Sequence, residues 1–471
     1  MNQCDYSYIF SEISKRHHRG SVQRINHETN RPEFLSISVN DDDLLSRRLA
    51  TMPAIVADLI DVASAVHVAD RLTPRREDAT YHIALTLPVR CPDIWGDVMV
   101  LDHLRKVLLW FTGDHWTFDF RRYGSLRRAS EHAVRLPFDV EADLPGEVAL
   151  WSGGLDSLAG LCSRLSSERD SLTRYTLLST GSSLYMDGVQ KKVAADLKKL
   201  AKHDADRLMF VRVPIRLTDS GHLAKNACMR SRGFTFLFMG AACAVLEGQS
   251  LLHIYENGVG AINLPYRLSE VDYDHSRAVH PLSLLAMSNL VSCVLDRHFA
   301  FSNPFLFQTK AAMCQSLTDP HLTSLIAKTV SCDSRHRAAE IQCGYCSSCL
   351  LRRQALAVAH IADGGAYLIN NTMAQRVPRD GDVHLRAMRH QIDTLHGALE
   401  GPDRWDGLCT RFVDLVDIAD RTAMAYGLTP MMMQAELVRL YGAYVREWDA
   451  LQAVTVTEQW LQTTGRMPQA A

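Results

Sequence analysis

The sequence predicts an α/β protein built around a parallel sheet with helices on both faces. From residue 146 onward, short runs rich in Val, Leu and Phe alternate with longer runs of helical periodicity, which is typical of parallel strands joined by helices. With 471 residues the chain is also too long for one ordinary core, so we expect more than one domain. A glycine-containing loop in this alternating region, and a cysteine cluster downstream of it, indicate its chemistry.

The composition is that of an ordinary globular protein, with 47% hydrophobic and 22% charged residues. The formal net charge of −2 gives no basic excess for nucleic acid or a membrane surface, and the densest basic run, residues 121–128, is interpreted as solvated surface. The first 20 residues lack the apolar run of a signal peptide, and no stretch approaches the roughly 18 apolar residues of a membrane span. We therefore expect a cytoplasmic protein with no membrane partner and no direct nucleic-acid partner.

Residues 1–145 carry no chemistry motif and are predicted to form an accessory α+β domain. Its end is placed near residues 139–147, an acidic segment that contains Pro and Gly. The strands predicted within it are residues 35–39, 81–89 and 116–123, and the predicted helices are residues 42–72 and 98–111.

Residues 146–362 are predicted to form the α/β domain itself, and the mostly helical residues 363–471 a C-terminal cap or partner surface. Strands separated by helices of this length favour a parallel, doubly wound sheet. The predicted strands are residues 147–153, 174–181, 207–215 and 251–258, and the predicted helices between them are residues 155–168, 185–203 and 232–248.

The segment SGGLDS, residues 152–157, lies where the first of these strands meets its helix, and α/β folds bind phosphates at this position. Exposed backbone N–H groups and the positive helix end attract an anion, and glycines allow its close approach. The segment lacks the lysine of a Walker loop, the G-x-G-x-x-G pattern of a dinucleotide site and the G-x-S-x-G pattern of an esterase. The structural alternative is a serine-capped helix after a glycine-containing turn.

The segment resembles the S-G-G-x-D-S loop of the ATP pyrophosphatase (PP-loop) superfamily. In that superfamily the loop binds the β- and γ-phosphates of ATP while a substrate oxygen attacks the α-phosphorus, which gives an adenylate and pyrophosphate. A carboxylate at Asp156 is explained if Mg²⁺ lies between it and the phosphates; otherwise it is a helix-start residue favoured by the dipole. The resemblance assigns ATP contacts to Ser152, Gly153, Gly154, Leu155, Asp156 and Ser157, with catalytic roles for Asp156 and Ser157.

A cluster of four cysteines follows, Cys332, Cys343, Cys346 and Cys349, with the spacing C-x10-C-x2-C-x2-C. Overlapping C-x2-C turns bring three thiolates together, and the fourth closes a tetrahedral site with no open position, which predicts structural Zn²⁺. An iron–sulfur cluster is the second alternative, and disulfides are the third. The other eight of the 12 cysteines are scattered and are interpreted as reduced residues, mostly in apolar surroundings.

The glycine loop, the cysteine spacing and the arginine-bearing segment LLRRQAL after it together resemble the QueC family of 7-cyano-7-deazaguanine synthases, over about residues 147–360. Members of that family activate 7-carboxy-7-deazaguanine with ATP, form the amide from ammonia and dehydrate it to the nitrile with further ATP. The resemblance implies a PP-loop α/β domain with structural zinc, and ATP and Mg²⁺ as cofactors.

Six further positions are candidates: Lys310 as a catalytic or phosphate-binding residue, and Arg230, Arg232, Glu256, Asn257 and Gly258 as substrate-binding residues. Lys310 matches the family's lysine segment before the zinc site, and residues 256–258 follow a strand end where they suit recognition of a purine-like edge. The two arginines suit a pyrophosphate or a substrate carboxylate. The alternatives are a solvated lysine at a helix start, an ordinary glycine turn and surface arginines.

Ordinary family members are about half this length. Long forms of this build resemble the QatC component of Qat antiphage systems and related proteins of type IV CBASS, which implies attachment of the deazapurine to a protein partner from the same operon. Our first hypothesis is therefore adenylation of a 7-deazaguanine carboxylate and amide formation on a partner protein in antiphage defence. The second is nitrile synthesis for queuosine or for modified DNA, and the third is a nucleotide-binding scaffold without catalysis.

Overall fold

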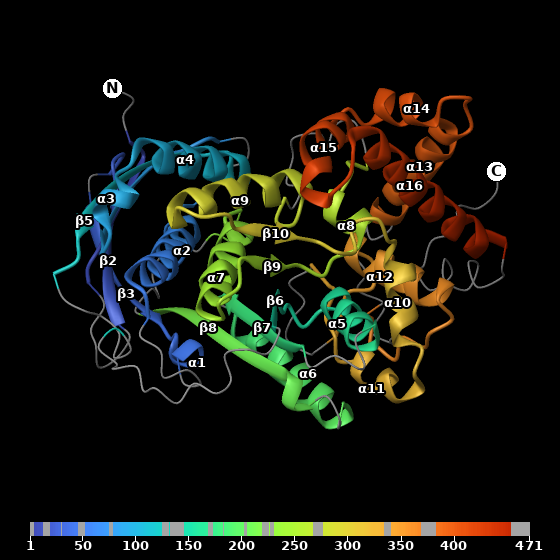
Figure 1. Ribbon diagram of the computed structural model, residues 1–471, viewed down its shortest axis with the longest axis horizontal. Coiled ribbons are helices and arrows are strands. Elements are labelled where there is room, and N and C mark those ends of the chain that lie inside the picture. The colour runs from blue at the N-terminus through green and yellow to red at the C-terminus, as the bar shows by residue number, and fades with distance from the viewer. Residues whose placement is uncertain are drawn as a thin grey trace.

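The structure is a computed structural model of residues 1–471 (Figure 1). It describes residues 4–12, 19–29, 31–45, 52–74, 79–124, 131, 146–167, 173–181, 183–201, 205–218, 226, 230–266, 277–333, 341–368 and 383–453.

The described strands form one 10-stranded sheet in the order β10-β9-β6-β7-β8-β3-β2-β1-β4-β5. Neighbours are parallel from β10 to β8 and again through β1, β4 and β5, whereas β8-β3, β3-β2 and β2-β1 are antiparallel. The predicted α/β class is therefore confirmed. The strands are β1 (Tyr6–Phe10), β2 (Arg19–Asn26), β3 (Arg31–Val39), β4 (His82–Val89), β5 (His115–Arg122), β6 (Gly146–Leu150), β7 (Arg174–Gly181), β8 (Leu208–Thr218), β9 (Leu251–His253) and β10 (Ala300–Ser302).

Helices cover both faces of the parallel part of the sheet (Figure 1). Side chains alternate between the faces, so that Leu177 of β7 packs with α5 (Leu155–Ser167) and α6 (Leu184–Leu200), while its neighbour Leu178 packs with α7 (Arg232–Leu246) and α9 (Pro281–Leu295). In open α/β sheets of this kind, ligands bind at the carboxyl ends of the parallel strands.

The N-terminal strands continue this sheet, because β3 pairs antiparallel with β8. One hydrophobic core runs through both parts, with α2 (Ala54–Leu72) and α4 (Val98–Thr112) packed beside α7 and α9. The expected single helix over residues 42–72 is wrong: α1 covers Asp42–Leu45, and α2 begins after Pro53, which suits a helix start but not a helix interior. The proposed end of an N-terminal domain, near residue 145, lies outside the described residues.

The C-terminal region is helical, as predicted, over its described part. Its helices α13 (Val383–Leu399), α14 (Arg404–Arg411), α15 (Asp414–Thr422) and α16 (Pro430–Ala453) share a hydrophobic core with α8 (Gly258–Ile262) and α12 (Ser347–Val358). This core places α16 against the α/β part of the chain (Figure 1). No helix among the described residues is both long and apolar enough to span a membrane.

The remaining helical segments are short. They are α3 (Pro92–Trp95), α10 (Lys310–Cys314), α11 (Thr323–Ile326) and the 3-10 turns Ala205–Arg207, Gln315–Leu317, Pro320–Leu322 and Ala423–Tyr426.

Candidate active site and metal centre

The SGGLDS segment forms the turn between β6 and α5, as the sequence predicts. Its polar groups are organised around Ser152, whose hydroxyl accepts the N–H of Gly154 at 3.1 Å and lies 3.1 Å from the Ser157 hydroxyl. Ser157 donates in turn to the Gly154 carbonyl at 3.0 Å. Leu155 is fully buried and packs in the core between α5 and the sheet.

Gly153 has a φ of +73°, in the left-handed region that favours glycine. A Cβ there would also lie 3.2 Å from Cα of Gln190 on α6. On its other side the loop contacts the segment before the cysteine cluster, because the Val330 N–H donates to the Gly153 carbonyl at 3.3 Å. The loop is therefore held between two parts of the chain that the sequence does not connect to it.

A buried polar cluster lies at the start of α5 and joins Asp156, Glu256, Asn257 and Lys310. One oxygen of Asp156 accepts the amide of Asn257 at 2.9 Å, and the other pairs closely with the Lys310 ammonium. The Asn257 amide also donates to Glu256 at 2.7 Å. Four candidates from distant parts of the sequence therefore meet at one point.

The topology of the sheet explains this convergence. After β8 the chain crosses back over the sheet, so that β9 lies on the other side of β6 from β7, and the strand order reverses between β6 and β9. Ligands of open α/β sheets bind at such a switch point. Asn303, which follows β10, fixes the loop after β9 by donating to the Glu256 carbonyl at 2.8 Å.

Local capping orients the side chains of the cluster. Asn257 is the N-cap of α8 and accepts the N–H of Gly260 at 2.9 Å, which leaves its amide free to face the two carboxyl groups. Thr309 caps α10 in the same way, so Lys310 is the first residue of that helix. Gly258 is required for packing, since a Cβ there would lie 1.9 Å from the Leu306 carbonyl.

The carboxyl groups of the cluster interact electrostatically. Burial, and then the neighbouring charge of Asp156, raise the pKa of Glu256 to about 8. Burial opposes the charge of Lys310, but Asp156 and Glu256 together raise the pKa of its ammonium group. In the structure Lys310 therefore balances an Asp156 carboxylate, and Glu256 is mostly protonated at neutral pH.

Arg230 and Arg232 lie at the start of α7, and their predicted roles stay predictions. Arg230 donates to the Thr112 carbonyl at 3.1 Å and so contacts the end of α4. Arg232 is exposed and its guanidinium lies 5.4 Å from the centre of the Phe236 ring. These contacts join Arg230 to α4 and Arg232 to its own helix.

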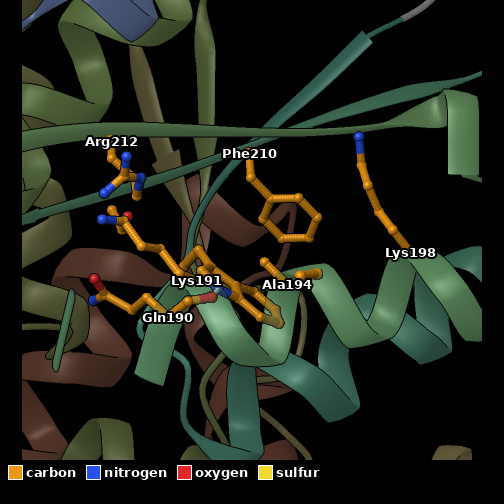
Figure 2. A pocket seen from close by; sticks show the side chains of 9 residues that line it. Gln190, Lys191, Ala194, Lys198, Phe210 and Arg212 are labelled. Atoms are coloured by element: carbon orange, nitrogen blue, oxygen red, sulfur yellow. Dashed lines mark hydrogen bonds between the residues drawn. The ribbon is translucent and has the colours of Figure 1, made fainter. Parts of the chain in front are cut away.

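A cavity of about 220 Å³ lies between α6 and the strands β7 and β8 (Figure 2). Trp151, which directly precedes the loop, forms part of its wall together with Phe210 of β8, and the two rings meet edge to face with their centres 5.3 Å apart. Gln190, Lys191, Ala194 and Lys198 of α6 and Arg212 of β8 line the rest of the wall that Figure 2 labels. The cavity combines aromatic surface with cationic and amide groups, which suits a planar polar ligand.

The four predicted cysteines come together. Their sulfur atoms all lie within 4.8 Å of one another, and the Sγ atoms of Cys343 and Cys349 are 3.9 Å apart. Tetrahedral zinc with Zn–S bonds of about 2.3 Å separates its sulfur ligands by about 3.8 Å, so the residues fit zinc. Backbone N–H groups of Cys343 and Cys346 point at the sulfurs of Cys332 and Cys343, at 3.4 Å and 3.2 Å. The cluster can hold a metal ion with all four positions occupied by protein.

The metal centre is connected to the glycine loop through α12, which starts directly after Cys346. Arg352 on this helix is fully buried and donates to the backbone carbonyls of Ile326 and Thr329, at 2.8 Å and 3.1 Å. The residues that Arg352 holds lead directly to Val330, whose N–H donates to the Gly153 carbonyl of the glycine loop. A metal bound at the cysteines would therefore stabilise the support of the loop.

Comparison with known families shows that residues 238–360 match the family model described as Queuosine biosynthesis protein QueC. This segment of the chain is QueC-like. No curated protein matches the chain. The QueC-like segment contains Glu256, Asn257, Lys310 and the four cysteines, and the SGGLDS loop precedes it. The match supports a PP-loop, ATP-utilising enzyme of the queuosine or deazapurine type.

Sequence patterns did not identify five residues that support the glycine loop and the polar cluster. These are Gln190, Asn303, Thr309, Val330 and Glu447. The threonine before Lys310 is a recognisable helix-cap signal. The others contact the site through tertiary packing alone, and no spacing in the sequence connects them to it.

Proposed function

We propose that the protein adenylates a 7-deazaguanine carboxylate with ATP and then forms an amide from the activated acyl group. The observation that carries the proposal is the meeting of Asp156, Glu256, Asn257 and Lys310 beside the SGGLDS loop, at the switch point of the sheet. A phosphate-binding loop next to a buried lysine and two carboxyl groups suits adenylate chemistry, and the family match supports the deazaguanine substrate.

In the proposed reaction a carboxylate oxygen of the substrate attacks the α-phosphorus of ATP and pyrophosphate leaves. An amine then attacks the acyl carbon, the C–N bond forms, AMP leaves, and the amine loses a proton. Ser152, Ser157 and the loop N–H groups bind the departing phosphates, and Lys310 offsets their charge. The oxygens of Asp156 suit Mg²⁺, which when bound would screen the phosphate charge.

We assign the adenosine end of ATP to the 220 Å³ cavity between α6 and the strands β7 and β8. Its aromatic wall is continuous with the glycine loop through Trp151. Its volume suits one purine base, and Gln190 and Ser179 offer polar groups to the edge of that base. Glu256 and Asn257 remain the proposed groups for the deazaguanine edge, Gly258 their backbone support, and Arg230 and Arg232 the proposed contacts to a carboxylate or pyrophosphate.

The amine acceptor is proposed to belong to a partner protein in antiphage defence, as the long form of the chain suggests. We place an accessory domain at residues 1–145, the ATP domain with zinc at 146–362 and a helical region at 363–471, and the first and last would dock the partner. The second candidate is nitrile formation with ammonia, favoured by the match to a queuosine biosynthesis family.

The test is to incubate the purified protein with ATP, Mg²⁺ and 7-carboxy-7-deazaguanine, with and without ammonium. The pyrophosphate that is released is then measured. Release that depends on the carboxylate supports adenylation, and an Asp156→Ala variant that releases as much as the wild type would contradict the site. Nitrile without a partner favours the second candidate. A deazaguanine mass shift on a co-purified protein favours the first. An absence of pyrophosphate release with either acceptor overturns both and leaves a nucleotide-binding scaffold.

A further inference from the structure

The C-terminal helix α16 packs directly on the two loops that carry the polar cluster. Leu440 lies over Gly258, where a Cβ would come within 2.7 Å of its Cδ2 atom. About two turns further along α16, Glu447 contacts the segment before Lys310. The helix therefore contacts both halves of the candidate site although it lies outside the QueC-like segment.

Glu447 makes two hydrogen bonds with its two oxygens. It accepts the Thr309 hydroxyl in a close contact, and it accepts the side-chain amide of Gln354 on α12 at 3.1 Å. Thr309 and Gln354 are almost completely buried, with 2% and 1% of their surfaces exposed. Glu447 itself is half-buried, and each of its two oxygens has a hydrogen-bond partner.

The hydrogen bond to Glu447 determines which hydrogen bonds the Thr309 hydroxyl donates and accepts. A threonine hydroxyl has one proton, which Thr309 donates in the hydrogen bond to Glu447. The lone pairs of the hydroxyl oxygen therefore face the first turn of α10. There it accepts the N–H of Ala312 at 3.1 Å. The first residue of that turn is Lys310, whose ammonium group pairs with Asp156.

We propose that Glu447 is a positioning residue, which fixes the Thr309 cap and thereby holds Lys310 against Asp156. This inference rests on the proposed function for its catalytic consequence. It also gives the C-terminal helices a role in building the site in addition to any docking role. Loss of the carboxylate frees the Thr309 hydroxyl to rotate, and a shift of about 1 Å in a catalytic group can lower a rate by as much as a hundredfold.

The Glu447→Gln variant removes the negative charge of the side chain but keeps its hydrogen-bonding groups, so it distinguishes a positioning role from a role of the charge. Its side-chain carbonyl can still accept the Thr309 proton. After a half-turn of the Gln354 amide, the carbonyl oxygen of Gln354, which has no hydrogen-bond partner among the described residues, can accept the new amide. We therefore expect Glu447→Gln to rescue what Glu447→Ala loses.

The experiment compares Glu447→Ala, Glu447→Gln and Thr309→Val with Asp449→Ala, an exposed position on the same helix. We expect the alanine and valine variants to lower kcat for pyrophosphate release roughly tenfold or more, with KM for ATP nearly unchanged, and the other two to retain wild-type values. Wild-type kcat in Glu447→Ala, or an equal loss in Glu447→Gln, would overturn the proposal.

Amide hydrogen exchange of residues 305–318 provides a readout that needs no catalysis. Exchange at the start of α10 should be faster in Glu447→Ala and in Thr309→Val than in the wild type and the two retained variants. Unchanged exchange in both would overturn the positioning role. If the wild type releases no pyrophosphate, the proposed function fails, while the exchange experiment still decides whether Glu447 fixes α10. If Glu447→Ala does not fold, Thr309→Val carries both measurements.

Discussion

The side-chain amide of Asn257 donates to the carboxylate of Asp156 over 2.9 Å, although 101 residues separate the two along the chain. The same asparagine caps α8 with its carbonyl oxygen. One side chain thus both starts a helix and orients the Asp156 carboxylate of the SGGLDS segment. Few residue types can replace Asn257, because the replacement must both cap the helix and donate a hydrogen bond to Asp156.

Asn257→Asp should abolish most of the activity without unfolding the protein. Aspartate caps a helix as well as asparagine, but it has no amide to donate and adds a negative charge beside Asp156 and Glu256. We expect pyrophosphate release to fall at least roughly tenfold and the melting temperature to fall little. The converse exchange at another cap, Asp97→Asn at the start of α4, is the control and should leave turnover unchanged. If the Asn257→Asp variant retains full activity, the side chain of Asn257 is not part of the active site.

Gly258→Ala should be strongly destabilising. The added Cβ would lie 1.9 Å from the Leu306 carbonyl, which is a backbone atom and cannot move aside as a side-chain end can. We expect a loss of about 1–3 kcal/mol or more in the free energy of unfolding, measured with denaturant. Gly397→Ala on α13 is the matched control. Nothing lies within 4 Å of its Cβ, so it should gain roughly 0.5–1 kcal/mol from helix propensity. Equal stabilities of the two variants would contradict this packing.

Glu256→Gln should become more stable than the wild type as the pH rises. The pKa of Glu256 is raised to about 8 in the folded protein by burial and by Asp156. A raised pKa contributes stability that is complete below the unfolded value, near 4.5, and is lost as the pH rises through the folded value. Glutamine cannot ionise, so the difference in melting temperature should grow between about pH 5 and pH 8 and then level off. Glu436→Gln on α16 controls for the substitution, and a pH-independent difference at Glu256 would exclude the shift.

Cys346→Ser should remove the metal and with it much of the folded stability. The wild type is expected to contain zinc when its metals are measured by mass spectrometry, and iron in its place would favour a cluster. Apparent zinc-binding energies on the order of 10 kcal/mol in small zinc domains show how much a structural ion can contribute. Cys409→Ser on α14, outside the cluster, should keep both metal and stability. A soluble and fully active Cys346→Ser protein would contradict a structural metal.

The strands and helices from 146 to 250 could be predicted closely because apolar runs and helical periodicity mark them directly. The predicted strand over residues 174–181 is β7 to the residue, and the helix predicted over 155–168 is α5 up to Ser167, since residue 168 lies outside the described residues. The strand predicted over 251–258 is regular only to His253, because the polar residues after it turn into the site. The strands β1, β2 and β10 have no clear pattern in the sequence and were identified only by their pairing in the sheet.

The sequence by itself determined the glycine loop, the cysteine ligand set and the candidate side chains, because each depends on residue types at short, fixed spacings. Only the tertiary structure decided that Asp156, Asn257 and Lys310 meet, that Val330 supports the glycine loop and that Glu447 reaches Thr309. These relationships depend on strand order and helix packing, which bring together segments with no local signal linking them. The candidate residues of the site were therefore visible in the sequence, whereas their assembly was not.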